Sequence, residues 1–128
     1  MAFEIRYTVN RGSITLKPKQ PVIDWLNSVD ALLEVNGDNI FDPLDEHGDM
    51  FLIPNDDLIE SRQEAVAWVE KRWRDFFEFE LGQWIIDDTL WPKKLSLKLF
   101  REWFDIEYRS MVWDLGQKPL KHEDWLEN

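Results

Sequence analysis

The chain has 128 residues, a formal net charge of −11, eight Trp, eight Phe and no Cys. This length fits one domain with one core, and the absence of thiols excludes disulfides, thiolate zinc sites and a cysteine nucleophile. No secretory signal is recognisable at the N-terminus, and no apolar run approaches the roughly 18 residues of a membrane span. We therefore expect a cytoplasmic protein with no membrane contact.

The negative charge is concentrated in one segment. Residues 21–60 carry eleven Asp and Glu and no Lys or Arg, whereas the segments before and after it sum to +3 and −3. Such a block repels phosphate backbones, because nucleic-acid binding needs basic groups that displace counterions. We therefore expect no nucleic-acid partner. An acidic block can instead dock a basic protein, bind a hard cation through oxygen ligands, or only keep the chain soluble.

The N-terminal third combines strand and helix patterns. Apolar and polar side chains alternate over residues 3–9 and again over 14–16, with a turn signal at 10–12, and this predicts a β-hairpin. Apolar residues at helical spacing then predict a helix over residues 21–33. An Asn-Gly pair follows, which fits either a helix C-cap or a hairpin turn, so residues 32–41 stay open between a helix end and two short strands.

The middle of the chain predicts a loop, a strand and a long helix. Residues 38–49 are rich in Asp, Gly and Pro and lack the ligand spacing of an EF-hand, so a solvated loop is favoured over a calcium site. The short apolar run 50–53 predicts a strand. A capping box at Ser61 begins the clearest helical pattern, which predicts one helix over residues 62–80 that ends at Gly82.

The C-terminal third changes its periodicity. Apolar spacing predicts a helix over 93–103 and then a strand over 105–114, because a continued helix would place Glu107 on its apolar face. One long helix to Leu115 is the alternative. Residues 116–128 predict a tail laid on the surface of a single domain spanning residues 1–128, with Leu120 and Trp125 as its anchors.

The order of these elements predicts the fold class. We expect an α+β fold in which an antiparallel sheet, formed by the N-terminal hairpin and later strands, has two or three helices packed on one face.

No motif for catalysis is recognisable. The sequence lacks a P-loop, a dinucleotide fingerprint, a nucleophile elbow and a His-Glu-x-x-His helix. Its two histidines, His47 and His122, come from distant irregular stretches, and a zinc site without Cys would need both. We expect no catalytic residue, no metal site and no cofactor, and we favour a non-enzyme.

Two hypotheses for function follow. In the first, the protein is an interaction domain of the inhibitor or immunity type that docks a basic protein, with acidic side chains steering association and an aromatic anchor supplying affinity. The acidic residues are Asp38, Asp42, Asp45, Glu46, Asp49, Asp56 and Asp57, and the anchor is Phe41 or Trp25.

The second hypothesis is a small-molecule or peptide-binding domain, or a weak enzyme, with a Trp-lined pocket. Its residues are Trp84, Asp87, Asp88 and Trp91. A carboxyl group beside an aromatic pocket can have a raised pKa through desolvation. The favoured alternative is that the two acidic residues only precede a helix and interact with its positive end.

Overall fold

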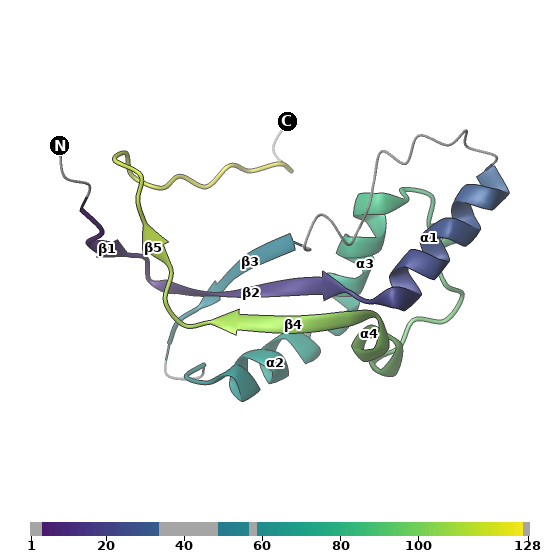
Figure 1. Cartoon of the computed structure of the whole chain (residues 1–128), viewed down its shortest axis with the longest axis horizontal. Helices are drawn as coiled ribbons and strands as arrows, with labels where there is room; N and C mark the ends of the chain where they lie inside the picture. The colour runs from purple at the N-terminus through teal and green to yellow at the C-terminus, as the bar shows by residue number, and fades with distance from the viewer. Residues whose placement is uncertain (1–3, 34–48, 57–58, 127–128) are drawn as a thin grey trace.

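The computed structural model describes residues 4–33, 49–56 and 59–126 of the chain. The elements are β1 (Tyr7–Thr8), β2 (Arg11–Pro18), α1 (Gln20–Leu33), β3 (Asp49–Pro54), α2 (Arg62–Glu70), α3 (Trp73–Trp84), η1 (Asp88–Leu90), α4 (Leu97–Trp103), β4 (Phe104–Arg109) and β5 (Trp113–Asp114). Figure 1 shows α2 and α3 behind a sheet formed by β2, β3 and β4, whereas β1 and β5 form a ribbon at one end. The α+β fold with antiparallel sheets is confirmed.

The central sheet has the antiparallel order β3-β2-β4. Ile14 in β2 lies opposite Phe51 in β3 and Tyr108 in β4. Because side chains alternate along a strand, Ile14 and Leu16 share one face, and both are fully buried. This face packs against the helices, so the alternation predicted for residues 14–16 and the strand predicted for 50–53 are both confirmed.

The N-terminal strands have different partners from those expected in a hairpin. β1 pairs with β5, placing Thr8 opposite Trp113, whereas β2 pairs with β3 and β4. The chain stays extended at Val9, whose N–H donates to the carbonyl of Val112 at 3.0 Å, instead of turning back on itself. β1 therefore runs on into β2, and β4 runs on into β5.

A one-residue mismatch separates the ribbon from the sheet. Four residues, 9–12, lie between the paired positions Thr8 and Ser13, whereas three residues, 110–112, lie between their partners Arg109 and Trp113. One extra residue on the first strand is the definition of a β-bulge. The bulge also divides the predicted strand 105–114 into β4 and β5.

The prediction of one helix over residues 62–80 is wrong, because two helices meet at Lys71 and Arg72. The Arg72 side chain lies over the Trp68 ring at 3.9 Å, and its Nη1 donates to the Trp68 carbonyl at 2.9 Å. That carbonyl would accept the Arg72 backbone N–H in a continuous helix, but this N–H donates to Val69 O instead. The Arg72 side chain thus donates to the Trp68 carbonyl that the break leaves without its backbone donor. The predicted end at Gly82 is also wrong, because α3 continues to Trp84.

The change from helix to strand near residue 104 is confirmed. α4 ends at Trp103, and β4 begins at Phe104 with Ile106 buried and Glu107 exposed. One long helix to Leu115 is therefore wrong. The helix begins at Leu97 and not at residue 93, because the Ser96 hydroxyl accepts the Leu99 N–H at 3.1 Å and caps it.

The core is aromatic. The ring of Phe77, which is fully buried, lies 5.7, 5.5 and 5.7 Å from the rings of Phe100, Trp103 and Phe104. Tilted and edge-to-face contacts at such distances are favourable beyond their buried area. The high aromatic content therefore builds one cluster that joins α3, α4 and β4.

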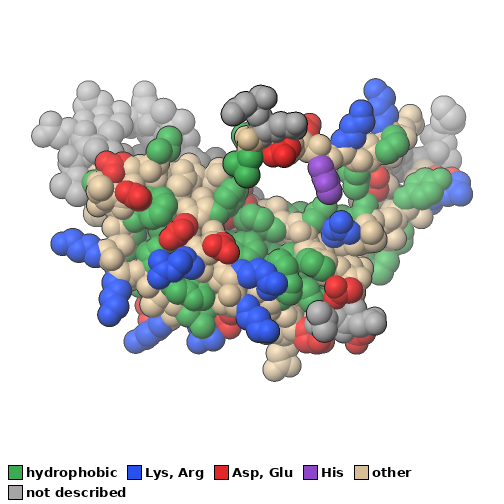
Figure 2. All heavy atoms as spheres, turned by 180° about the vertical axis from the view of Figure 1, so that it is seen from behind, with side chains coloured by type: hydrophobic (Ala, Val, Ile, Leu, Met, Phe, Trp, Pro, Cys, Tyr) green, Lys and Arg blue, Asp and Glu red, His purple; other side chains and the backbone are tan. Residues whose placement is uncertain are grey.

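The C-terminal tail lies largely in solvent. Leu120 is 63% exposed and Trp125 is 91% exposed, so neither side chain anchors the tail on the described part of the chain. Figure 2 shows an opening between this segment and the body of the molecule. No described helix is long and apolar enough to cross a bilayer.

Candidate functional site

The structure describes only part of the proposed acidic surface. Six of its residues lie outside the described residues: Asp38, Phe41, Asp42, Asp45, Glu46 and Asp57. Asp49 and Asp56 are exposed near the two ends of β3. Between them, Met50 is 65% exposed and Leu52 is 51% exposed on the side of the strand that faces away from the helices. The described part of the surface is thus an apolar strand face that Asp56 follows, whereas Asp49 lies opposite Leu16 on the helical side of the strand.

Trp25 belongs to the core and not to a docking surface. Its ring is only 9% exposed and lies 5.8 Å from the ring of Trp103. Its Nε1 donates to the carbonyl of Leu90 at 3.0 Å. Because an anchor for a partner must be accessible, this burial removes Trp25 from the proposed site.

The buried carboxyl group of Glu80, in α3, lies next to the first residue of β3, Asp49. Glu80 in α3 is 1% exposed, and its Oε1 atom has no hydrogen-bond partner. Desolvation raises the pKa of Glu80 to about 9, and both the negative charge of Asp49 and a hydrogen bond with it contribute. Glu80 is therefore protonated at neutral pH and donates a hydrogen bond to the exposed side chain of Asp49.

The four residues of the proposed Trp-lined pocket have separate structural roles. The Trp84 ring stacks on Phe104, nearly parallel at 6.2 Å, and Trp91 Nε1 donates to the carbonyl of Ile85 at 2.8 Å. Both rings are partly buried against the core, whereas Asp88 is exposed in η1.

Asp87 is a capping residue. Its Oδ1 accepts the Thr89 N–H at 3.0 Å and the Thr89 hydroxyl at 2.6 Å. These hydrogen bonds lower the pKa of Asp87, because they favour the charged form. The expectation that the pKa of Asp87 is raised, as in a catalytic acid beside an aromatic pocket, is therefore wrong. The favoured alternative, that Asp87 interacts with the start of a helix, agrees with its place before η1.

The break between α2 and α3 creates two adjoining hollows, a feature that the sequence pattern did not predict. The first, of about 380 Å³, is lined by Glu64, Ala67, Trp68, Lys71 and Arg72. The second, of about 280 Å³, is lined by Phe51, Arg72, Asp75, Phe76 and Phe79. We call the second one the β3–α3 hollow. Arg72 lies between the two, so one guanidinium group borders both.

The β3–α3 hollow has aromatic walls and charged edges. The Phe51 ring meets the rings of Phe76 and Phe79 edge-on at 5.1 and 5.7 Å. Phe79 is nevertheless 49% exposed, which leaves half of its surface for a ligand. Figure 2 shows, on the face seen from behind, apolar side chains interspersed with basic and acidic ones. Such a surface can bind a large apolar side chain together with neighbouring charges.

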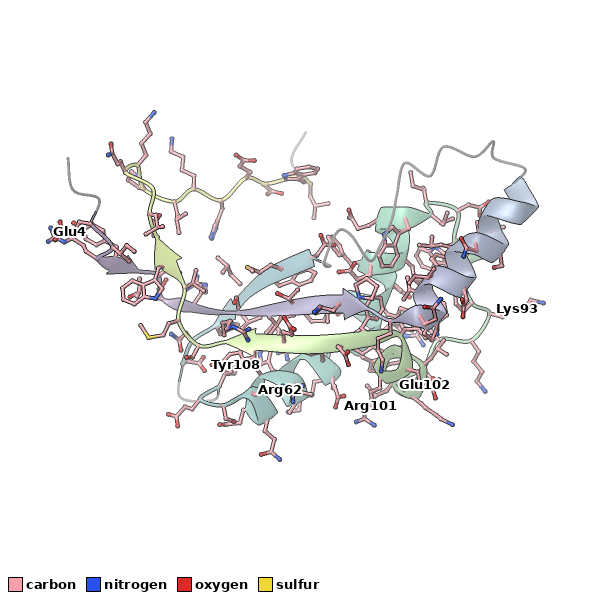
Figure 3. All side chains as sticks on the ribbon, in the orientation of Figure 1. Glu4, Arg62, Lys93, Arg101, Glu102 and Tyr108 are labelled. Atoms are coloured by element: carbon pink, nitrogen blue, oxygen red, sulfur yellow. The ribbon has the colours of Figure 1, made fainter. Side chains whose placement is uncertain are left out.

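The two helices that flank the core are held by specific ionic contacts. Arg101 in α4 makes a two-pronged ion pair with Glu70 in α2, with N–O distances of 2.7 and 2.9 Å, and this contact lowers the pKa of Glu70. Arg62 in α2 donates to the carbonyl of Ile106 at 3.1 Å; Figure 3 shows both arginines on the side of the sheet occupied by α2. These contacts fix α2 and so position one wall of the first hollow.

Sequence reasoning missed Glu80, Phe79 and Arg72 as site residues. Glu80 carried a signal, because it lies three and four residues after Phe77 and Phe76, on the apolar face of its helix. Arg72 carried no such signal in the sequence, because no Gly or Pro marks the break between α2 and α3. Among the described residues, no group of three or more His, Cys, Asp or Glu is arranged to hold a metal ion. Comparison with known proteins adds no relative: no family model, no curated protein and no solved structure matches this chain.

Proposed function

We propose that this protein is a non-enzymatic interaction domain that docks a basic protein partner. The observation that carries the proposal is the surface of β3, where exposed Met50 and Leu52 lie on the side that faces away from the helices and exposed Asp56 follows the strand. Exposed apolar residues surrounded by charge are typical of protein-binding surfaces. Among the described residues, β3 is paired with β2 alone.

Charge and apolar surface have different roles in this proposal. The net charge of −11 attracts a basic partner over a distance of about one Debye length, roughly 10 Å at 0.1 M salt, and so accelerates association. The apolar side chains of Met50 and Leu52 then supply the short-range contact that slows dissociation. Because β3 is an edge strand of the described sheet, an extended segment of the partner can add to it through backbone hydrogen bonds.

The test uses a partner isolated with the tagged full chain at low salt and identified by mass spectrometry. We expect its association rate to fall several-fold when Asp56 is changed to Lys, and to fall further at high salt. The change of Met50 and Leu52 to Ala raises mainly the dissociation rate. Glu102→Lys, on the exposed side of α4, is the matched control for charge. Association that depends on neither salt nor Asp56 would overturn the proposal.

A further inference from the structure

The outer edge of β3 adjoins the β3–α3 hollow. Phe51, in the middle of β3, forms one wall of this hollow, and the other lining residues belong to α3 or directly precede it. None of the lining residues that the structure describes comes from β2, the strand on the other side of β3 in the sheet. The hollow therefore lies at the outer margin of the sheet, where a strand added to β3 would run.

The side chains of such an added strand would alternate between the two sides of the sheet. Phe51 lies opposite Ile14, which is fully buried on the helical side, so Phe51 occupies this side too. Directly opposite residues of an antiparallel pair have their Cβ atoms about 4.5–5.5 Å apart on the same side. The added residue opposite Phe51 therefore projects toward the hollow, whereas its two neighbours pass over Met50 and Leu52 on the other side.

The hollow suits one large neutral side chain. Its volume of about 280 Å³ is below the range of about 300–1,000 Å³ that is typical of pockets for drug-sized ligands. Its walls are Phe rings, and Phe79 keeps 49% of its surface exposed. Arg72 and Asp75 border the hollow with opposite charges, so it offers a charged group no net attraction. An aromatic side chain is thus the group that fits best.

The next position of β3 on the helical side is acidic. Asp49 lies opposite the buried Leu16, on the same side as Phe51, and the Asp49 side chain is exposed. In an antiparallel strand, the residue opposite Asp49 comes two positions after the residue opposite Phe51. A Lys or Arg at that position meets the Asp49 carboxylate, and opposite charges in such cross-strand pairs are favourable.

We propose that the partner binds β3 through an extended antiparallel segment in which an aromatic, an apolar and a basic residue follow one another. The aromatic side chain occupies the β3–α3 hollow, the apolar one covers Met50, and the basic one pairs with Asp49. This inference rests on the proposed function, because it specifies the partner of the same strand. The described segment beyond this edge in Figure 1 is the tail, and Figure 2 shows an opening between the tail and the body of the molecule.

A synthetic peptide tests the inference without the isolated partner. The probe is a capped peptide, Thr-Thr-Val-Trp-Val-Arg-Thr, whose Trp and Arg lie opposite Phe51 and Asp49 when it adds to β3. We expect it to bind the full chain saturably, as measured by fluorescence anisotropy of the labelled peptide. Its dissociation constant rises about tenfold or more in Phe79→Ala, which removes a wall of the hollow.

Two further variants of the chain complete this measurement. Asp49→Asn raises the dissociation constant about two- to fivefold, because it removes the charge but keeps an acceptor for the proton of Glu80. Ile86→Ala is the matched control, since Ile86 is 92% exposed and does not line the hollow, and its dissociation constant is that of the wild type. Circular dichroism verifies that each variant is folded.

Changes in the peptide separate strand addition from other modes of binding. A peptide with Thr in place of Trp binds about tenfold more weakly or worse, and Phe79→Ala then has little further effect, because the two changes remove the same contact. The reversed peptide places Arg opposite Ile53 in the antiparallel orientation, so it binds more weakly than the probe. The bound probe also slows hydrogen exchange of the backbone amides of residues 49–54.

Four results would overturn the inference: a probe that does not bind, equal binding to Phe79→Ala, equal binding of the reversed peptide, or unchanged hydrogen exchange in β3. None of them would overturn the proposed function, which is judged by how association of the isolated partner depends on salt and on Asp56. A partner can also cover Met50 and Leu52 without adding a strand to β3.

Discussion

Replacing the buried carboxyl group of Glu80 by an amide is expected to change how stability depends on pH. The folded pKa of Glu80 is about 9 against a usual value of 4.5, so between these values the folded state binds one proton that the unfolded state has lost. Stability therefore decreases as pH rises through this window, by about 1.4 kcal/mol per pH unit for one proton. From pH 5.5 to pH 7.5 the loss is about 2–3 kcal/mol.

Glu80→Gln removes this dependence, because an amide has no proton to lose. We expect the difference in unfolding free energy between Glu80→Gln and the wild type to grow by about 2–3 kcal/mol in favour of the variant from pH 5.5 to pH 7.5. Urea unfolding at a series of pH values measures it, and other titrating groups largely cancel in the difference. The control is Glu78→Gln, which removes a half-buried carboxylate of the same helix that lies 3.5 Å from Arg74.

Parallel stability curves for Glu80→Gln and the wild type would refute this reasoning. They would mean that Glu80 ionises in the folded protein near its usual pKa, with water or a counter-charge reaching the unpaired Oε1 atom. A curve that is steeper for the variant than for the wild type would contradict the sign of the effect.

Two further substitutions test the packing of the helices. Trp25→Phe keeps an aromatic ring against Trp103 but leaves the Leu90 carbonyl without its donor, so we expect a loss of about 1–3 kcal/mol in urea unfolding; an unchanged midpoint would contradict the role of that hydrogen bond. Glu70→Gln removes the ion pair with Arg101. Because the pKa of Glu70 is lowered in the folded state, the pair stabilises the protein above the usual carboxyl pKa of 4.5. The variant is then less stable than the wild type at neutral pH, the difference vanishes as the pH falls through the folded pKa, and a constant difference would argue against the pair.

Periodicity was sufficient to predict the local structure wherever burial determines it. The change from helix to strand after Trp103 followed from Glu107, which a helix would bury and which the strand exposes beside Lys17 at 3.3 Å. Ser61 correctly marked the start of α2, and its hydroxyl accepts the Glu64 N–H at 3.2 Å. Such features depend on residues close in sequence, so the pattern contains them.

The features that sequence could not predict depend on contacts between side chains and backbone or between distant strands. The end of α2 depends on Arg72, whose side chain satisfies the Trp68 carbonyl, and no propensity of Arg indicates that contact. The hollows follow from this break, and so they were missed too. The pairing of β1 with β5 joins segments about a hundred residues apart, which alternation alone leaves unspecified.

Because of the bulge between the ribbon and the sheet, the number of residues in the connection 9–12 determines on which side of the strand the N-terminal side chains lie. Side chains alternate with a period of two, so the extra residue among 9–12 reverses which side of the first strand Ile5 and Tyr7 occupy relative to Ile14. Removing one residue there would turn both apolar side chains to the opposite side, whereas exchanging one residue for another would not. Substitutions and two-residue insertions at this connection therefore preserve the orientation of the ribbon, whereas single insertions or deletions invert it.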